Sequence, residues 1–224
     1  MDYSFLSKTT LFKGHSESEI ESVLNCLAYS IRSFHKDEVI YHTGDQVNDV
    51  GLILSGSVQI ESINILGDKS ILGIFSSGEV FAESYACTPN TPIMVDVLAL
   101  EKSEILFINI PSIFSENSIC HHGTKILQNL LQISSGKNLT LSMRIFHTAP
   151  KTIRARLLSF FSEQTNLQKS MHITIPMSRQ QLADYLGVDR TALSKELSKM
   201  KEDGLLDYRK NEFTIKVTKD IPTL

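Results

Sequence analysis

The sequence lacks a long apolar run, a secretion signal and a disulfide-forming set of cysteines. Its longest segment without a charged residue, residues 84–95, has 12 residues and contains two prolines, whereas a membrane-spanning helix needs about 18 apolar residues or more. The first residues have neither a basic start nor an apolar run, unlike a signal peptide. The three cysteines, Cys26, Cys87 and Cys120, are widely spaced and odd in number, which argues against a disulfide framework. We expect a soluble cytoplasmic protein.

The composition is that of a globular protein with an uneven distribution of charge. The 224 residues are 42% hydrophobic and 21% charged, enough for one large domain or two modest ones. Residues 1–148 hold 9 Lys and Arg against 16 Asp and Glu, whereas residues 149–224 hold 13 against 9. The basic last third favours contact of that part with a polyanion such as nucleic acid.

A β-rich zone follows a short N-terminal helix. Ser16 and Glu19 form a capping-box pattern, which predicts a helix to about Leu27. Short apolar runs separated by glycines then extend from about residue 32 to residue 110, a pattern typical of a small barrel or jelly roll. The runs cover residues 38–41, 50–54, 57–61, 70–75, 94–100 and 104–108. We assign residues 1–116 to this domain.

The next segment, residues 117–148, has the pattern of a long helix. Its apolar residues cover more than one buried stripe, so we expect it to pack on the β-rich domain and on a second copy of the chain. Pro150 interrupts it, and Thr148 is a candidate N-cap for the following helix. We therefore place the last domain at residues 149–224.

Two short helices with a tight turn are the most specific feature of this last domain. Ser178 and Gln181 form a second capping box, Gly187 suits a turn with positive φ, and Asp189 is a candidate N-cap for a helix to about Asp203. Leu193, Leu197 and Met200 share one face of that helix at 100° per residue. The other face carries small polar and basic residues: Arg190, Thr191, Ser194, Lys195 and Ser198.

A polar turn between two apolar runs, residues 205–208 and 213–217, predicts a β-hairpin after the second helix. A helical hairpin with a solvated polar face is the simpler alternative. The coincidence of capping box, turn glycine, apolar back, polar front and hairpin favours a helix that enters the major groove of DNA.

Residues 178–197 resemble the winged helix-turn-helix of the CRP/FNR family of bacterial transcription regulators. Gly44, Asp45 and residues 54–58 resemble the β-roll signature of the same family. The resemblance covers essentially the whole chain and implies an α+β fold. Its parts are an N-terminal double-stranded β-helix (jelly-roll-like) sensor domain, a long dimerisation helix and a C-terminal winged helix-turn-helix. It also implies a homodimer that binds a palindromic operator in double-stranded DNA and contacts RNA polymerase.

Carried over by position, the resemblance assigns base readout to Arg190, Thr191, Ser194 and Lys195, and phosphate contacts to Ser178, Gln180 and Ser198. Arg190 is the candidate guanine reader, because a guanidinium pairs with guanine through two hydrogen bonds; a phosphate contact is its alternative role. Family members often carry glutamate where Thr191 stands and arginine where Lys195 stands. The usual family half-sites therefore do not transfer to this chain.

The sensor domain departs from the family's known ligand sites. Glu83 stands on the ribose position of the cAMP-binding members, but Ala82 replaces the glycine before it, and no Lys or Arg lies between Lys69 and Lys102. A buried phosphate without a cationic partner is costly, so we expect an effector other than cAMP. Three cysteines do not supply the four thiolates of an iron–sulfur cluster. We predict no cofactor and no metal, and we interpret His121, His122 and His147 as surface or hinge residues; a haem ligated by Cys87 or by one of these histidines is the alternative.

A pocket between the β-roll and the long helix is the candidate effector site. Its predicted lining is Phe81, Glu83, Tyr85, Thr91, Ser134 and Ser135. The alternative is that these residues bind no ligand and the protein binds DNA constitutively. A cupin-type metal enzyme is the third interpretation, but His35 and His42 are seven residues apart and lack the required His-x-His spacing. We predict no enzyme activity. The segment His147–Pro150 is predicted to act as a hinge.

Overall fold

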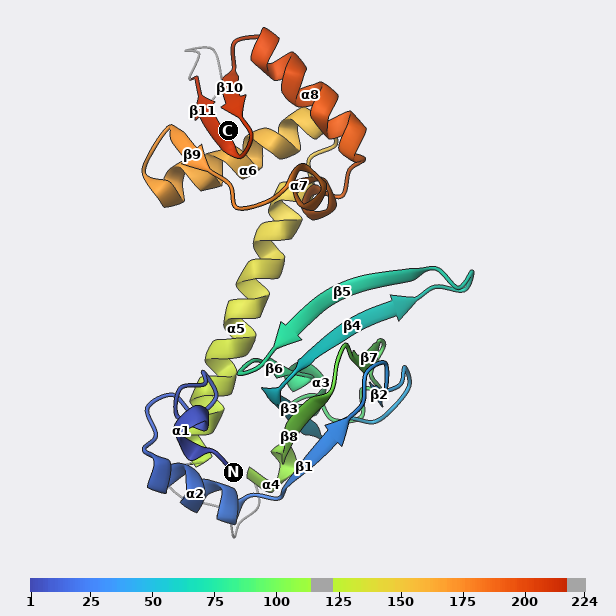
Figure 1. Ribbon diagram of the computed structural model, residues 1–224, viewed down its shortest axis with the longest axis vertical. Helices are drawn as coiled ribbons and strands as arrows, with labels where there is room; N and C mark the ends of the chain where they lie inside the picture. Colours follow the sequence, from blue (N-terminus) through green and yellow to red (C-terminus); the bar gives the residue numbers. More distant parts are fainter. Residues whose placement is uncertain (114–122, 217–224) are drawn as a thin grey trace. The chain divides into compact units, whose positions relative to one another are not determined.

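A computed structural model describes residues 1–113 and 123–216 (Figure 1). The chain divides into two compact units, Met1–Gly136 and Lys137–Leu224. The division falls inside the long helix α5, Gly123–Thr148. The sequence-based ranges 1–116, 117–148 and 149–224 stay predictions, and residues 117–122 lie outside the described part.

Two four-stranded antiparallel sheets form the body of the first unit. One has the order β1-β8-β3-β6 and the other β2-β7-β4-β5. The strands are β1 (Tyr29–Phe34), β2 (Val39–Tyr41), β3 (Asp49–Ser55), β4 (Ser57–Ile63), β5 (Lys69–Ser76), β6 (Val80–Phe81), β7 (Asp96–Ala99) and β8 (Ser103–Asn109). This arrangement confirms the predicted jelly-roll-like β-domain.

The aromatic core of this β-domain explains why one glycine is required. The Phe107 ring lies edge-on to Phe81, with centroids 6.3 Å apart, and to Tyr41, with centroids 6.0 Å apart. Gly51 on β3 faces Phe81, and a Cβ atom there would lie 2.3 Å from the ring. The close approach of backbone and ring therefore excludes a side chain at this position.

Short helices cover the β-domain. They are α1 (Tyr3–Leu6), α2 (Glu17–Cys26), α3 (Glu83–Ala86) and α4 (Ile110–Ile113). The predicted capping box is present at α2, because Ser16 accepts from the Glu19 backbone and Glu19 accepts from the Ser16 backbone. The buried side chain of Asn129 on α5 donates to the carbonyls of Leu11 and Lys13, at 2.8 and 3.0 Å. The N-terminal segment is thus attached to α5.

The second unit contains three helices beyond α5 and a three-stranded sheet in its described part. The helices are α6 (Ile153–Gln168), α7 (Arg179–Leu186) and α8 (Arg190–Glu202), and the strands are β9 (His172–Thr174), β10 (Leu206–Arg209) and β11 (Glu212–Ile215) in the order β10-β11-β9. The predicted hairpin is therefore confirmed as β10–β11. The strand β9, which the sequence analysis did not predict, pairs with β11.

The start of α6 differs from the prediction. Thr148, the predicted N-cap, is the last residue of α5, and its hydroxyl donates to the Arg144 carbonyl at 2.8 Å. Thr152 caps α6 instead by accepting from the Ala155 backbone. Pro150 disfavours helical backbone at the residue before it, which explains why α5 ends there and the next helix begins after it.

The polar attachment of the N-terminal segment is testable. Asn129→Ala leaves two carbonyls without their donor, so we expect a loss of about 1–3 kcal/mol in the free energy of unfolding. Gln128→Ala, on the exposed neighbouring position of the same helix, is the control and is expected to change it by less than about 0.5 kcal/mol. Urea unfolding measures both, and equal midpoints would contradict the attachment.

Candidate nucleic-acid interface

The turn between α7 and α8 is built from three local devices. Ser178 and Gln181 cap the start of α7 reciprocally. Gly187 adopts φ +63°, and the Val188 backbone donates to the Ala183 carbonyl at 3.0 Å. Asp189 then caps α8 by accepting from the Ala192 backbone at 2.8 Å. These contacts confirm the predicted helix-turn-helix.

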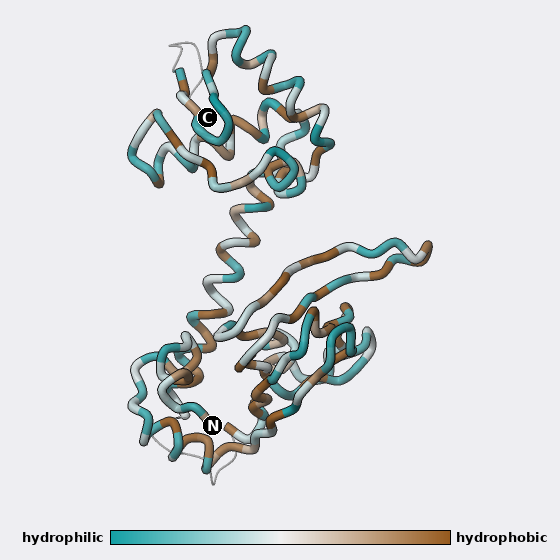
Figure 2. Tube along the Cα trace, viewed as in Figure 1, coloured by the Kyte–Doolittle hydropathy of each residue, from teal (hydrophilic) through white to brown (hydrophobic). Residues whose placement is uncertain are grey.

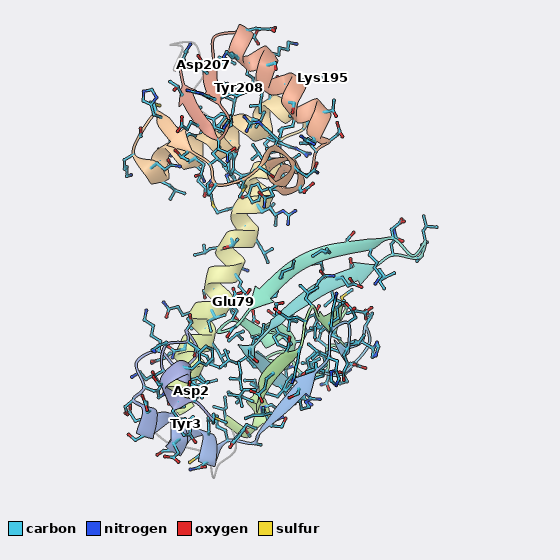
Figure 3. The ribbon with its side chains drawn as sticks, in the orientation of Figure 1. Asp2, Tyr3, Glu79, Lys195, Asp207 and Tyr208 are labelled. Atoms are coloured by element: carbon cyan, nitrogen blue, oxygen red, sulfur yellow. The ribbon has the colours of Figure 1, made fainter. Side chains whose placement is uncertain are left out.

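The two faces of α8 have opposite chemistry. Leu193, Leu197 and Met200 are fully buried in the core of the second unit. Of the predicted base readers, Arg190, Thr191 and Lys195 are exposed and Ser194 is half-buried. Lys195 projects from α8 in Figure 3. The helix therefore has an apolar back and an accessible polar front, as a helix in the major groove requires.

The three predicted phosphate-binding residues are exposed and make local contacts. Ser178 accepts from the Gln181 backbone at 3.2 Å, and Gln180 donates to the Asp184 carboxylate at 2.8 Å. Ser198 donates to the Ser194 carbonyl at 3.2 Å and lies 3.4 Å from the Tyr208 hydroxyl of β10. Their roles toward DNA stay predictions.

Two arginines hold the C-terminal end of α7. Arg144 on α5 contacts the carbonyls of Asp184 and Tyr185, at 3.3 and 3.4 Å. Arg156 on α6 donates to the carbonyls of Leu186 and Gly187, at 2.9 and 3.2 Å. Cationic donors stabilise the unpaired carbonyls at a helix end. The sequence analysis missed both arginines, because their partners are backbone atoms some 30 to 41 positions away.

A third arginine attaches α6 to α8. Arg154 lies 2.6 Å from Glu196 and 2.7 Å from Asp203, both of which belong to α8 or its C-cap. These hydrogen bonds raise the pKa of the Arg154 guanidinium. Since Arg154 is partly exposed, its two ion pairs contribute more to positioning α8 than to the stability of the fold.

The hairpin β10–β11 is attached to α7 by Arg179. Its guanidinium lies over the rings of Tyr208 and Phe213, at 5.1 and 4.8 Å, and donates to the Lys210 carbonyl at 2.7 Å. Burial lowers the pKa of Arg179. The hairpin turn, Lys210 and Asn211, is thereby held next to the start of α7, and both of its residues are exposed. No sequence signal marks this arginine.

The predicted effector residues belong to the first unit. Phe81 and Glu83 are buried, Tyr85, Thr91 and Ser134 are half-buried, and Ser135 is exposed on α5. Ala82 adopts φ +62°, so the backbone keeps a left-handed turn where the cAMP-binding relatives have glycine. A surface cavity of about 250 Å³ in this unit has another lining, namely Ala28, Tyr29, Ser30, Asp49, Phe107 and Asn109.

His147 is not a surface residue. It is fully buried within the second unit, because aromatic rings of α6 and α7 enclose its imidazole; the predicted hinge at His147–Pro150 stays a prediction. His121, His122 and Cys120 lie outside the described residues. Among residues 1–113 and 123–216, no group of three His, Cys, Asp or Glu side chains is placed to hold a metal ion, and no helix is both long and apolar enough to span a bilayer.

The turn glycine allows a matched test. Gly187→Ala forces an L-residue into the left-handed region, so we expect it to destabilise the second unit by about 1–2 kcal/mol. Gly136→Ala replaces a helical glycine that has open space around it, and we expect a gain of up to about 1 kcal/mol. Thermal unfolding measures whether each variant is more or less stable than the parent protein, and a Gly187→Ala protein as stable as the parent would contradict the turn geometry.

Two family models match the chain. The cyclic nucleotide-binding domain matches residues 31–115, and the Crp-like helix-turn-helix domain matches residues 155–219. The first covers the β-domain and the second covers α7, α8 and the β10–β11 hairpin. The matches agree with the two parts of the predicted architecture.

Relatives with the same organisation are known. The electron transport regulator A of Shewanella oneidensis is 24% identical over 185 residues, 80% of this chain and 71% of the relative. The global nitrogen regulator of Synechococcus elongatus is 22% identical over 205 residues, 84% and 86% of the two chains. The solved structure of the c-di-GMP-responsive regulator CLP of Xanthomonas campestris matches this chain with a TM-score of 0.55 at 21% identity. The match covers 91% of this chain and 100% of CLP and shows the same fold. The chain belongs to the CRP/FNR family of bacterial transcription regulators.

Proposed function

We propose that the chain acts as a homodimer that binds a palindromic operator through α8. The observation that carries this proposal is the division of α8 into a fully buried apolar back and an exposed front with Arg190 and Lys195. A helix anchored in this way enters the major groove without exposing apolar surface.

Each polar residue of the front has a proposed role. Arg190 reads guanine with its two-pronged guanidinium, while Thr191, Ser194 and Lys195 contact neighbouring base edges. Ser178, Gln180 and Ser198 contact phosphates and so set the position of α8 on the duplex. The positive balance of residues 149–224 adds attraction that does not depend on base sequence and weakens with salt.

The apolar surface of α5 supports dimerisation. Five apolar residues of this helix are 60 to 69% exposed: Leu131, Leu139, Leu141, Ile145 and Phe146. Figure 2 shows hydrophobic residues recurring along α5. A second copy of α5 would cover them, as apolar residues at helical spacing do in paired helices. The two α8 helices of the dimer then contact half-sites one helical turn apart, about 34 Å.

The β-domain is proposed to bind a small effector other than cAMP. Phe81, Glu83, Tyr85, Thr91, Ser134 and Ser135 are the proposed lining, and no Lys or Arg lies between Lys69 and Lys102 to pair with a cyclic phosphate. Binding of the effector shifts the equilibrium between two poses of the dimer. As a DNA-bound regulator, the protein acts in the cytoplasm and contacts RNA polymerase.

The base-reading role predicts a defined loss of affinity. On an operator selected from random DNA, Arg190→Ala and Lys195→Ala are each expected to weaken binding by about 1–3 kcal/mol. Lys36→Ala removes the same charge from an exposed turn of the first unit and is the control. Fluorescence anisotropy at constant salt measures all four proteins, and equal affinities would contradict the role of α8.

The dimer predicts a native mass of twice the 25.1-kDa chain. Leu139→Glu places a charge in the proposed seam and is expected to give monomers, whereas Leu167→Glu, at a position of α6 with matching exposure (67% against 66%), is expected to remain dimeric. Native mass spectrometry before and after denaturation also detects any released effector. A monomeric parent protein would contradict the dimer.

A further inference from the structure

A buried histidine connects three helices of the second unit. His147 lies in the last turn of α5, and its side chain is fully buried. Its Nδ1 lies 2.9 Å from the Tyr185 hydroxyl of α7, and its Nε2 lies 3.2 Å from the Glu163 carboxylate of α6. The rings of Phe160 and Tyr185 pack against the imidazole, with centroids 5.4 and 5.8 Å away.

One protonation state satisfies these contacts. With the proton assigned to Nε2, the neutral imidazole accepts from the Tyr185 hydroxyl at Nδ1, and Nε2 lies near the Glu163 carboxylate without a hydrogen bond to it. The Nε2 contact is electrostatic, since it is not aligned as a hydrogen bond. His147 therefore holds Tyr185 by a specific hydrogen bond as well as by packing.

Charged and titratable groups from all three helices surround the imidazole. Glu163 faces it from α6 and Tyr185 from α7, and Arg144 of α5 lies 5.9 Å from the Tyr185 ring. Burial lowers the pKa of His147 below its usual value, and Glu163 offsets only part of this effect. Burial likewise raises the pKa of the Tyr185 hydroxyl. Both pKa shifts favour an uncharged imidazole and an uncharged tyrosine hydroxyl near neutral pH.

Tyr185 lies at the end of α7, directly before the turn to the recognition helix. Its own carbonyl and that of Asp184 are contacted by Arg144, which is one helical turn before His147. The last turn of α5 thus holds the end of α7 twice, once at its backbone and once at its Tyr185 hydroxyl. These contacts lie directly before the turn that leads to α8.

We propose that His147 and Tyr185 are positioning residues for DNA binding, which couple the pose of α5 to the helix-turn-helix through one hydrogen bond. This inference rests on the proposed function. It assigns no contact with DNA to either side chain. Protonation of Nδ1 forces this hydrogen bond to reverse and places a charge on the buried imidazole, so the coupling is strongest with neutral His147 and weakens in acid.

The sign of the pH effect follows from burial. The unfolded chain protonates His147 near its usual pKa of about 6.5, whereas the folded chain resists protonation until the pH is lower. Stability contributed by this group is therefore present above about pH 6.5 and is lost as the pH falls below it. We expect operator affinity to fall in the same range.

The experiment measures operator affinity at pH 7.5 and at pH 5.5 for the parent protein and four variants. Tyr185→Phe keeps the ring and removes the hydroxyl, His147→Gln keeps a polar side chain that does not titrate, and Tyr29→Phe on the exposed strand β1 is the control. The fourth variant is the double variant of His147 and Tyr185. At pH 7.5 we expect Tyr185→Phe to weaken binding about 2- to 10-fold, the contribution of one hydrogen bond.

The parent protein is expected to lose more affinity in acid than His147→Gln. The double variant is expected to bind no more weakly than the weaker single variant, because the two single substitutions remove the same interaction. Tyr185→Phe equal to Tyr29→Phe, with the same acid response in parent and His147→Gln, would overturn the positioning role. A parent protein that selects no operator at all would instead overturn the proposed function. If His147→Gln does not fold, Tyr185→Phe alone decides: weaker binding than Tyr29→Phe supports the positioning role, and equal binding overturns it.

Discussion

The short turn at Gly187 is the constraint on which the second unit depends. It changes the direction of the chain within the few residues between Leu186 and the cap Asp189, so α8 packs its apolar side on the core. A helix end in such a turn leaves carbonyls unpaired, and Arg144 and Arg156 supply their partners from α5 and α6. The polar front of α8 remains accessible because its apolar back is held so firmly.

The same arginines and His147 give the last turns of α5 a second role. The exposed apolar residues of α5 suit pairing with another copy, while its final turn is bonded to α7. One helix therefore carries both the proposed dimer seam and the attachment of the helix-turn-helix. If two copies of α5 pair as proposed, the contacts of Arg144 and His147 with the end of α7 offer a route by which that pairing would affect α8.

Much of the fold was predictable because its signals are local. Capping residues at Ser16, Ser178 and Asp189 and the positive φ of Gly187 depend on neighbours within a few positions. The strand β1, with five of six residues exposed, and the two-residue β6 carry no such pattern. Arg179, Arg154 and His147 were missed or misread because their partners are distant in sequence. Thr148 was misassigned since Thr152 has the same local chemistry and lies on the correct side of Pro150.

The selected operator itself tests the central claim most directly. Random DNA bound by the full-length protein is enriched and sequenced, and a footprint of the protein on the winning sequence is then recorded. We expect two inverted half-sites whose centres lie one helical turn apart, about 34 Å, each protected in the major groove. A single half-site, direct repeats, or the absence of any enriched sequence would contradict a dimer that reads DNA through α8.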